Sequence, residues 1–367
     1  MFKNLARASV VTLAAMLALA APVHSRAQPA PPLKVAFVYV SPIGTAGWSY
    51  QHEQGRLAMQ KALGSSVVST AVESVAEGAD SERVIRDLAA QGNRLIFATS
   101  FGYLEPTLRV AADHPDVKFA HAGGYKTAAN VATYNARYYE ARYLAGLLAG
   151  KSSKSGIAGY VAGFPVPEVI QGINAFTLGM REANPNASVK VLWLNSWFDP
   201  TRESEAAQSL IDQGADVLTN HSGSPAVAQT AQANFAAKGV RMIAYQSDMK
   251  AFAPDAQLAA VTHHWGGYYT QVARAVIEGR WKPQPVWGGM KDGLVQLGAI
   301  RADVPASVQA LIETRRKAIV EGRLKPFTAP LVDNEGTVRL ATGALDDSSI
   351  SSMKWFVRGV AGSLPKP

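Results

Sequence analysis

The chain has 367 residues and no cysteine, which excludes disulfides, thiol nucleophiles and thiolate metal sites. Its formal net charge is +8, but the 36 Lys and Arg residues are spread along the chain, which argues against nucleic-acid binding. A chain of this length is long for one hydrophobic core and suits two lobes.

The first residues have the layout of a secretory signal peptide. Lys3 and Arg7 form a short basic start, the apolar run Val10–Ala21 follows, and small residues precede a cleavage point after Ala27. The apolar run is shorter than the roughly 20 residues that a membrane-spanning helix needs. We therefore expect residues 1–27 to be removed on export to the periplasm. Without cysteine the mature protein is not expected to be a lipoprotein.

From Lys34 onward, short apolar runs rich in β-branched residues alternate with helical stretches. This alternation predicts a parallel sheet with helices on both faces. The strands predicted in the first unit are 34–40, 67–72, 94–99, 118–121 and 131–134. The helices predicted between them are 50–63, 81–91 and 105–113.

The pattern then starts again, which indicates two copies of one α/β unit. Four segments recur in the same order: Lys34–Val40 as Gly156–Ala162, Leu88–Ile96 as Leu210–Leu218, Val117–Phe119 as Val240–Met242, and Tyr138-Tyr139 as Tyr268-Tyr269. The first two matches share one offset of 122 residues. The fold class predicted is therefore α/β, with two doubly wound parallel-sheet lobes. Such sheets bind ligands outside the carboxyl ends of their strands.

The predicted division of the chain follows from this repeat. The ranges are 33–125 plus 250–286 for the first lobe, 126–249 plus 287–345 for the second lobe, and 346–367 for a C-terminal segment. Hinge crossings are expected near Gly124, Asp248 and Pro285. The Pro- and Gly-rich stretch at 281–289 predicts the third crossing, and 308–322 is predicted to be a helix.

Signatures of catalysis are missing from the sequence. There is no G-x-S-x-G, no H-E-x-x-H and no phosphate-binding glycine pattern. The seven histidines are scattered apart from His263-His264, and carboxylates are sparse at the predicted strand ends. We therefore expect a binding protein rather than an enzyme, with no cofactor and no metal.

Aromatic residues with a few polar neighbours follow the predicted strands. Trp48, Trp197 and Trp265 lie there beside Gly, Pro and polar residues. Flat aromatic walls suit a planar heterocycle, since stacking a base on such a ring is worth roughly 1–3 kcal/mol. Asp or Gln side chains can then contact ring nitrogens. The predicted ligand-binding residues are Trp48, Tyr50, His52, Phe101, Phe164, Glu168, Trp197, Phe198, Asp199, His221, Gln246, Asp248 and Trp265.

Several of these segments together carry a family resemblance. They are Phe37–Gly44, Gly47–Arg56, Tyr139–Gly146, Trp197–Pro200, Ser247–Pro254 and Val332–Gly336. They resemble the basic membrane protein (BMP) family of ABC-transporter substrate-binding proteins, which includes purine-nucleoside receptors, over nearly the whole mature chain. The resemblance implies a type I periplasmic binding protein whose lobes are joined by a three-crossing hinge. It also implies delivery of a small solute to the permease subunits of an ABC importer in the inner membrane, and we expect a monomer.

Nucleoside-binding members of that family clamp the purine between two aromatics, and the matching positions are Trp48 and Trp197. Thr45 replaces an acidic residue that many relatives have, Gly223 replaces an expected Asp, and His264–Trp265 replaces a lysine. Losing acids that would hold a ribose favours a free purine base, such as adenine, over a nucleoside. A receptor for a sugar or an amino acid, and a nucleoside hydrolase, are the alternatives left open.

Overall fold

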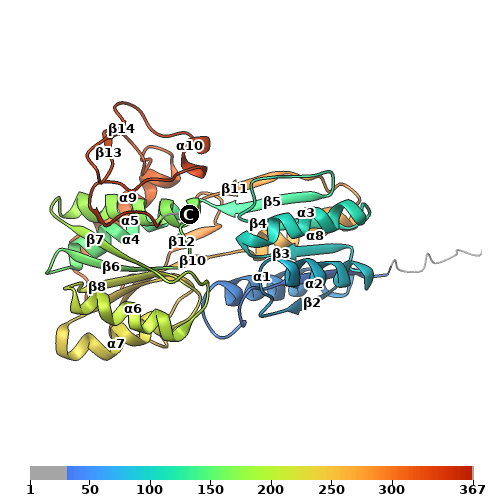
Figure 1. Cartoon of the computed structure of the whole chain (residues 1–367), viewed down its shortest axis with the longest axis horizontal. Coiled ribbons are helices and arrows are strands. Elements are labelled where there is room, and N and C mark those ends of the chain that lie inside the picture. The colour runs from blue at the N-terminus through green and yellow to red at the C-terminus, as the bar shows by residue number, and fades with distance from the viewer. Residues whose placement is uncertain (1–30, 366–367) are drawn as a thin grey trace, which may run out of the picture. The chain divides into compact units, whose positions relative to one another are not determined.

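Two largely parallel sheets, each covered by helices, organise the computed structural model, which describes residues 31–365 (Figure 1). The chain from Pro32 onward forms one unit by its internal contacts. The first sheet contains, in spatial order, β2 (Val67–Val72), β1 (Leu33–Val38), β3 (Leu95–Ala98), β4 (Lys118–Ala122), β5 (Val131–Ala136) and β11 (Pro285–Gly288). The second contains β15 (Val360–Ala361), β7 (Ser188–Trp193), β6 (Ile157–Ala162), β8 (Val217–His221), β9 (Arg241–Gln246), β10 (Gln257–His263) and β12 (Val295–Leu297).

The strand order confirms the duplicated unit. The order β2-β1-β3-β4-β5-β11 in the first sheet is repeated as β7-β6-β8-β9-β10-β12 in the second, with β15 added beside β7. Neighbouring strands pair in parallel, except that β12 runs antiparallel to β10. In both sheets the order reverses beside the first strand of the unit, and ligands of open α/β sheets bind outside such a point.

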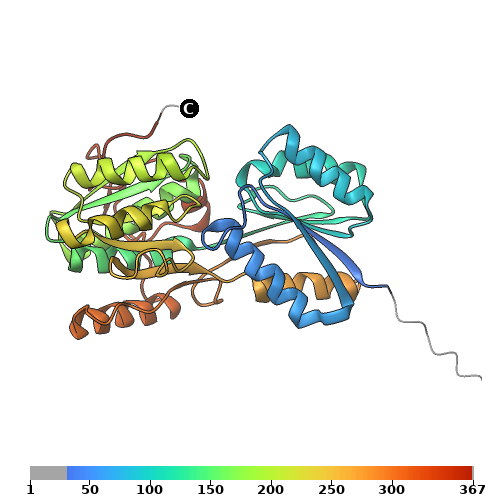
Figure 2. The same ribbon diagram turned by 90° about the horizontal axis from the view of Figure 1, so that it is seen from below.

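Helices cover both faces of each sheet. On the first sheet, α1 (Trp48–Leu63) packs with α8 (Gly266–Ile277), and α2 (Ala79–Ala90) packs with α3 (Leu104–Asp113) on the opposite face, as Figure 2 shows. On the second sheet, α4 (Tyr138–Ser152) lies with α5 (Pro167–Ala183) and α9 (Ala306–Val320), while α6 (Pro200–Asp212) lies with α7 (Ala226–Lys238).

The sequence of α4 explains its central place. Every residue from Tyr138 to Ala149 except Glu140 is buried, because the sheet lies on one side of the helix and α5 and α9 on others. A helix with mostly apolar side chains on all of its faces is expected in such an interior position. Its one fully buried charge, Arg142, lies over the Tyr245 ring at 3.4 Å and donates to Asn220 O and Thr219 Oγ1.

The chain passes between the sheets three times, and two of these passages lie away from the expected positions. The three passages are β5 to α4, β10 to α8, and β11 to β12. Strand β5 belongs to the first sheet because it pairs in parallel with β4, so the passage comes after Ala136 and not near Gly124. Strand β10 pairs with β9 in the second sheet, so that passage follows His263 and not Asp248. The loops at Gly124 and Asp248 connect neighbouring strands of one sheet.

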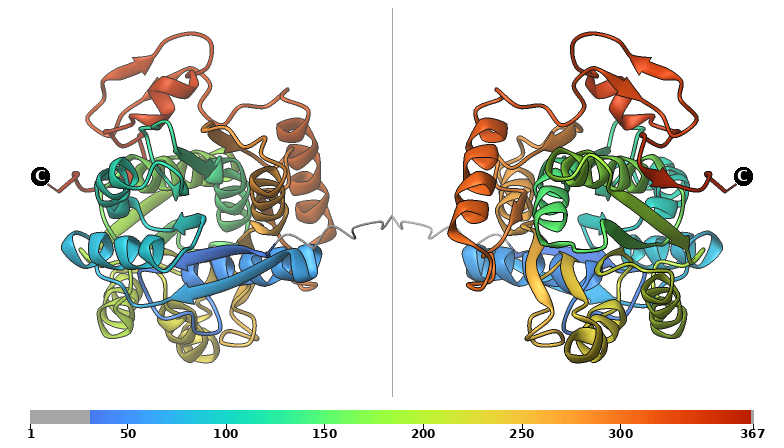
Figure 3. Two further views of the ribbon diagram at one scale, coloured as in Figure 1. Left: turned by 90° about the vertical axis from the view of Figure 1, so that its right-hand side faces the viewer. Right: turned by 90° about the vertical axis from the view of Figure 1, so that its left-hand side faces the viewer.

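The C-terminal segment packs on the second lobe (Figure 3). It contains the hairpin β13 (Leu331–Val332) and β14 (Val338–Leu340), the short helix α10 (Asp347–Ser351), and β15. Asp347 accepts two hydrogen bonds of 2.6 Å from Arg137, whose guanidinium lies 4.5 Å from the Trp287 ring centre. One arginine therefore ties together the first passage, β11 and the C-terminal segment. The predicted signal peptide lies outside the described residues.

Candidate functional site

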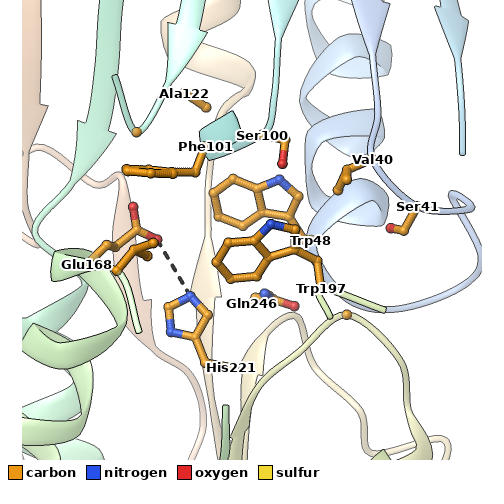
Figure 4. Close-up of a pocket in the computed structure, with 13 residues that line it drawn as sticks. Val40, Ser41, Trp48, Ser100, Phe101, Ala122, Glu168, Trp197, His221 and Gln246 are labelled. Carbon is orange, nitrogen blue, oxygen red and sulfur yellow. Dashed lines mark ion pairs between the residues drawn. The ribbon is translucent and has the colours of Figure 1, made fainter. Parts of the chain in front are cut away.

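A pocket of about 520 Å³, part of which is open to solvent, lies at the carboxyl ends of strands from both sheets (Figure 4). The first lobe lines it with Val40, Ser41, Trp48, Ser100, Phe101, Ala122 and Gly123. The second lobe lines it with Val166, Glu168, Trp197, His221, Gly223 and Gln246.

Trp48 is the first residue of α1. Its indole is held by one hydrogen bond and by contacts with neighbouring rings. Its Nε1 donates to Thr99 O at 2.6 Å, at the end of β3. Its ring packs edge-on against His52 and His263, with ring centres 4.5 and 5.8 Å away. These contacts fix the indole while leaving it half-buried, so part of its surface faces the pocket.

Trp197 comes from the loop between β7 and α6 in the other lobe. Phe164 supports it in an edge-to-face contact with ring centres 4.8 Å apart. The following residues begin α6, because Pro200 stands in its first turn and Asp199 caps it by accepting from Arg202 N at 3.1 Å. Trp197 is thus placed by a rigid helix start and an aromatic neighbour, and it remains half-buried.

Polar groups gather at one side of the pocket. Glu168 Oε1 lies 3.6 Å from His221 Nε2 (Figure 4). Its Oε2 accepts from Asn135 Nδ2 at 3.0 Å. Burial lowers the pKa of His221, and the Glu168 carboxylate opposes that shift, so the imidazole is neutral at pH 7. Arg142, packed beneath, anchors the end of β8 through Asn220 O.

Two buried polar atoms of the pocket residues lack a hydrogen-bond partner among residues 31–365. They are Gln246 Oε1 and His221 Nδ1. Gln246 also has a positive φ of 72°, an uncommon conformation for a residue other than glycine. Strained backbone and unpaired buried polar atoms both occur preferentially at functional sites.

Six of the thirteen residues predicted for the site line this pocket: Trp48, Phe101, Glu168, Trp197, His221 and Gln246. Three more lie close behind it. Phe164 and Phe198 pack against Trp197 and Gly223, and Asp199 is occupied as a helix cap.

The other four predicted residues lie elsewhere, which corrects the expectation. His52 and Trp265 are buried in the first lobe, where their rings stack at 5.3 Å because α1 and α8 pack together. Tyr50 and Asp248 line a separate surface groove, and Asp248 accepts from Gln257 Nε2 at 2.7 Å.

Sequence reasoning did not select the small residues of the pocket. Ser41 and Ser100 follow β1 and β3, so the rule that pointed to the aromatics at strand ends applied to them equally. Among residues 31–365, no group of three or more His, Asp or Glu side chains is placed to hold a metal ion. Within the same residues, no helix is both long and apolar enough to span a membrane.

Comparisons with known proteins place this geometry in a family. A protein of Brucella abortus (strain 2308) named as a purine-binding protein is 50% identical over 335 residues, which cover 91% of this chain and 94% of that protein. A Haloferax volcanii protein named as a candidate glucose-binding protein of an ABC transporter is 35% identical over 91% of this chain and 81% of its own.

A crystal structure of a solute-binding protein of an ABC transporter system from Aeropyrum pernix K1 has the same fold. Its TM-score is 0.68 at 22% identity, covering 82% of this chain and 94% of that one. Residues 33–323 match the family described as Bmp, ABC transporter substrate-binding protein PnrA-like. The chain therefore belongs to the Bmp family of PnrA-like ABC transporter substrate-binding proteins, which act outside the cytoplasm with membrane permease partners.

Proposed function

We propose that this protein captures a free purine base between Trp48 and Trp197 and delivers it to an ABC importer. The observation that carries the proposal is the pairing of two half-buried indoles, one from each lobe, on a single pocket. Each aromatic face that stacks on a base contributes roughly 1–3 kcal/mol. The name of the Brucella abortus relative supports the same ligand class.

Polar groups beside the indoles suit the edge of a purine. The Glu168 carboxylate accepts hydrogen bonds from ring or exocyclic N–H groups, and Gln246 Oε1 is a second acceptor without a partner in residues 31–365. His221 Nδ1 can accept from or donate to a ring nitrogen, depending on its tautomer. Adenine, with an amino group beside ring nitrogens, matches this set of acceptors.

The glycine at position 223 favours a base over a nucleoside. Gly223, which stands where the family pattern has an acid, lies against the backbone of Gly47 from the opposite lobe. Gly47 N also donates to Ser247 Oγ at 2.7 Å. These backbone contacts occupy the side of the pocket at Gly223 and leave no carboxylate there to bind sugar hydroxyls.

Export completes the proposal. We place the mature protein in the periplasm, as a monomer without a lipid anchor, after cleavage near Ala27. Mass spectrometry of a periplasmic extract should find an N-terminus close to Gln28. Intact Met1 on cytoplasmic material would contradict the assignment.

A thermal-shift screen tests the ligand class. Adenine, hypoxanthine, adenosine, glucose and leucine should be compared, because a ligand at a hundred times its dissociation constant adds about 2.7 kcal/mol to folding stability. We expect the free bases to raise the unfolding temperature. Stabilisation by glucose alone would favour the sugar receptor that the Haloferax volcanii relative suggests.

Incubation of the protein with adenosine tests the remaining alternative, a nucleoside hydrolase. We expect the protein to bind without turnover, because the pocket offers Glu168 but no second carboxylate among its described lining residues. Adenosine incubated with the protein should be recovered unchanged by chromatography. Release of adenine at a rate proportional to protein concentration would overturn the binding-only assignment.

A further inference from the structure

We infer that Glu77 positions Trp197 across the cleft and thereby couples capture of the base to closure of the lobes; this inference rests on the proposed function. Glu77 lies in the loop between β2 and α2, in the first lobe. Its Oε1 accepts from Trp197 Nε1 of the second lobe at 3.2 Å. The bond holds the N–H edge of the indole at the first lobe.

The same oxygen also organises the pocket wall of its own lobe. Glu77 Oε1 accepts from Ser100 Oγ at 2.6 Å and from Gly102 N at 2.8 Å. These two residues flank Phe101, which lines the pocket together with Ser100. One carboxylate oxygen therefore connects two parts of the pocket wall. It bonds the turn that carries Phe101 in the first lobe and the Trp197 indole of the second lobe.

The glycine at position 102 makes room for this carboxylate. A Cβ there would lie 2.5 Å from Glu77 Oε2 and 2.8 Å from Oε1. Gly102 is not among the residues with positive φ, so its backbone does not require glycine. A glycine at this position therefore leaves space for Glu77 where the carboxylate lies in this structure.

Glu77 acts through these neighbours and not by contact with the ligand. It is absent from the pocket lining and its side chain is exposed. The bond to Trp197 joins the two lobes, so it forms only when they come together. An interaction present in the closed state alone shifts the equilibrium toward closure and adds to ligand affinity.

The test compares Glu77→Ala, Glu77→Gln and Gly102→Ala by calorimetric titration with adenine. A hydrogen bond to a charged group at an exposed site corresponds to about a three- to tenfold change in affinity. We expect Glu77→Ala to weaken adenine binding by that factor. Glu77→Gln, which keeps a carbonyl acceptor, should recover part of it.

Gly102→Ala should match Glu77→Ala, because the added methyl displaces the carboxylate. It should have no further effect in the Glu77→Ala background, where that space is free. Asp80→Asn removes an exposed charge close by in the chain and should bind as the wild type does, so it is the matched control. Additive effects of Gly102→Ala and Glu77→Ala would overturn the inference.

A double-mutant cycle with Trp197→Phe isolates the bond across the cleft, because phenylalanine keeps a ring but lacks the N–H donor. In that background Glu77→Ala should weaken adenine binding by a smaller factor than it does in the wild-type background, because only the bonds to Ser100 and Gly102 remain to be lost. An unchanged effect there, or wild-type affinity of Glu77→Ala alone, would overturn the role of Glu77. If the wild type binds no adenine, the purine assignment fails instead, and the same variants are titrated with the ligand that the thermal screen identifies.

Discussion

Trp48 and Trp197 are the side chains on which ligand capture depends most. Each is half-buried, and each is held by contacts that survive removal of the other ring, because none of these contacts involves the other indole. We expect Trp48→Ala and Trp197→Ala each to weaken adenine binding about 5- to 150-fold, the equivalent of roughly 1–3 kcal/mol per stacked face. Isothermal titration calorimetry measures this loss directly.

Two other tryptophans serve as controls for that prediction. Trp281 lies outside the pocket, with Lys118 Nζ 5.6 Å from its ring centre, so Trp281→Ala should leave affinity unchanged. Trp265 is 1% exposed in the first lobe, so Trp265→Ala should instead lower the free energy of unfolding by about 3–5 kcal/mol. Wild-type affinity in both pocket variants would refute the purine sandwich.

His52 makes stability depend on pH. Burial lowers its pKa from 6.5 to about 3, so the unfolded chain binds a proton that the folded protein does not. The free energy of unfolding that depends on a neutral His52 is fully present above pH 6.5. It falls by about 1.4 kcal/mol per pH unit between pH 6.5 and about 3.

Replacing His52 isolates this effect from other titrating groups. His52→Leu should flatten the fall in unfolding free energy by about 2 kcal/mol between pH 7 and pH 5, measured by urea denaturation. Tyr269, the hydrogen-bond partner of His52, keeps Tyr134 as a partner at 2.9 Å. An identical pH profile in wild type and variant would show that His52 is not a buried neutral histidine.

At the scale of elements, the start of α1 meets the loop after β8 from the opposite lobe. Gly47, the N-cap of α1, has a φ of 95°, and a Cβ on it would collide with the Gly223 carbonyl oxygen. We expect Gly47→Ala to weaken adenine binding about 5- to 150-fold, because overpacking of this contact costs about 1–3 kcal/mol in the closed state.

Gly44 provides a matched control in the same loop. It also has positive φ, 56°, but a Cβ on it would meet nothing within 4 Å. Gly44→Ala therefore adds a Cβ at a positive φ in the same loop without the collision, and it should bind adenine as tightly as the wild type. Equal losses in the two variants would mean that strain in the loop, and not contact between the lobes, weakens binding.

At the scale of the whole molecule, two of the hydrogen bonds that join the lobes across the cleft indicate closure around a ligand. They are Gly47 N to Ser247 Oγ at 2.7 Å and Trp197 Nε1 to Glu77 Oε1 at 3.2 Å. We expect adenine to reduce the radius of gyration measured by small-angle X-ray scattering, since hinged closure is the usual response of two-lobed receptors. Gly47→Ala should show a smaller reduction, whereas unchanged scattering of the wild type at saturating adenine would contradict closure.

The duplicated α/β architecture could be predicted because its signals are local. The apolar runs Lys34–Val40 and Gly156–Ala162 contain β1 and β6, and their common offset reveals the repeat. The strand-end rule likewise brought Trp48, Trp197 and Gln246 to one pocket, because the carboxyl ends of parallel strands share one edge.

Other features depended on which elements pack together. Trp265 follows a strand end as Trp48 does, yet α8 returns to pack on α1, which buries the Trp265 ring against His52. The first passage between the lobes lies later in the chain than predicted, because β5 pairs with β4 in the first sheet. Such pairing is a contact between two segments, and residue types alone do not reveal it. Glu77 gives no signal in the sequence, since its role depends on a hydrogen bond to a residue 120 positions away. Residue types and their periodicity therefore determined the lobes and the edge where a ligand binds, whereas long-range packing alone decided which side chains reach it.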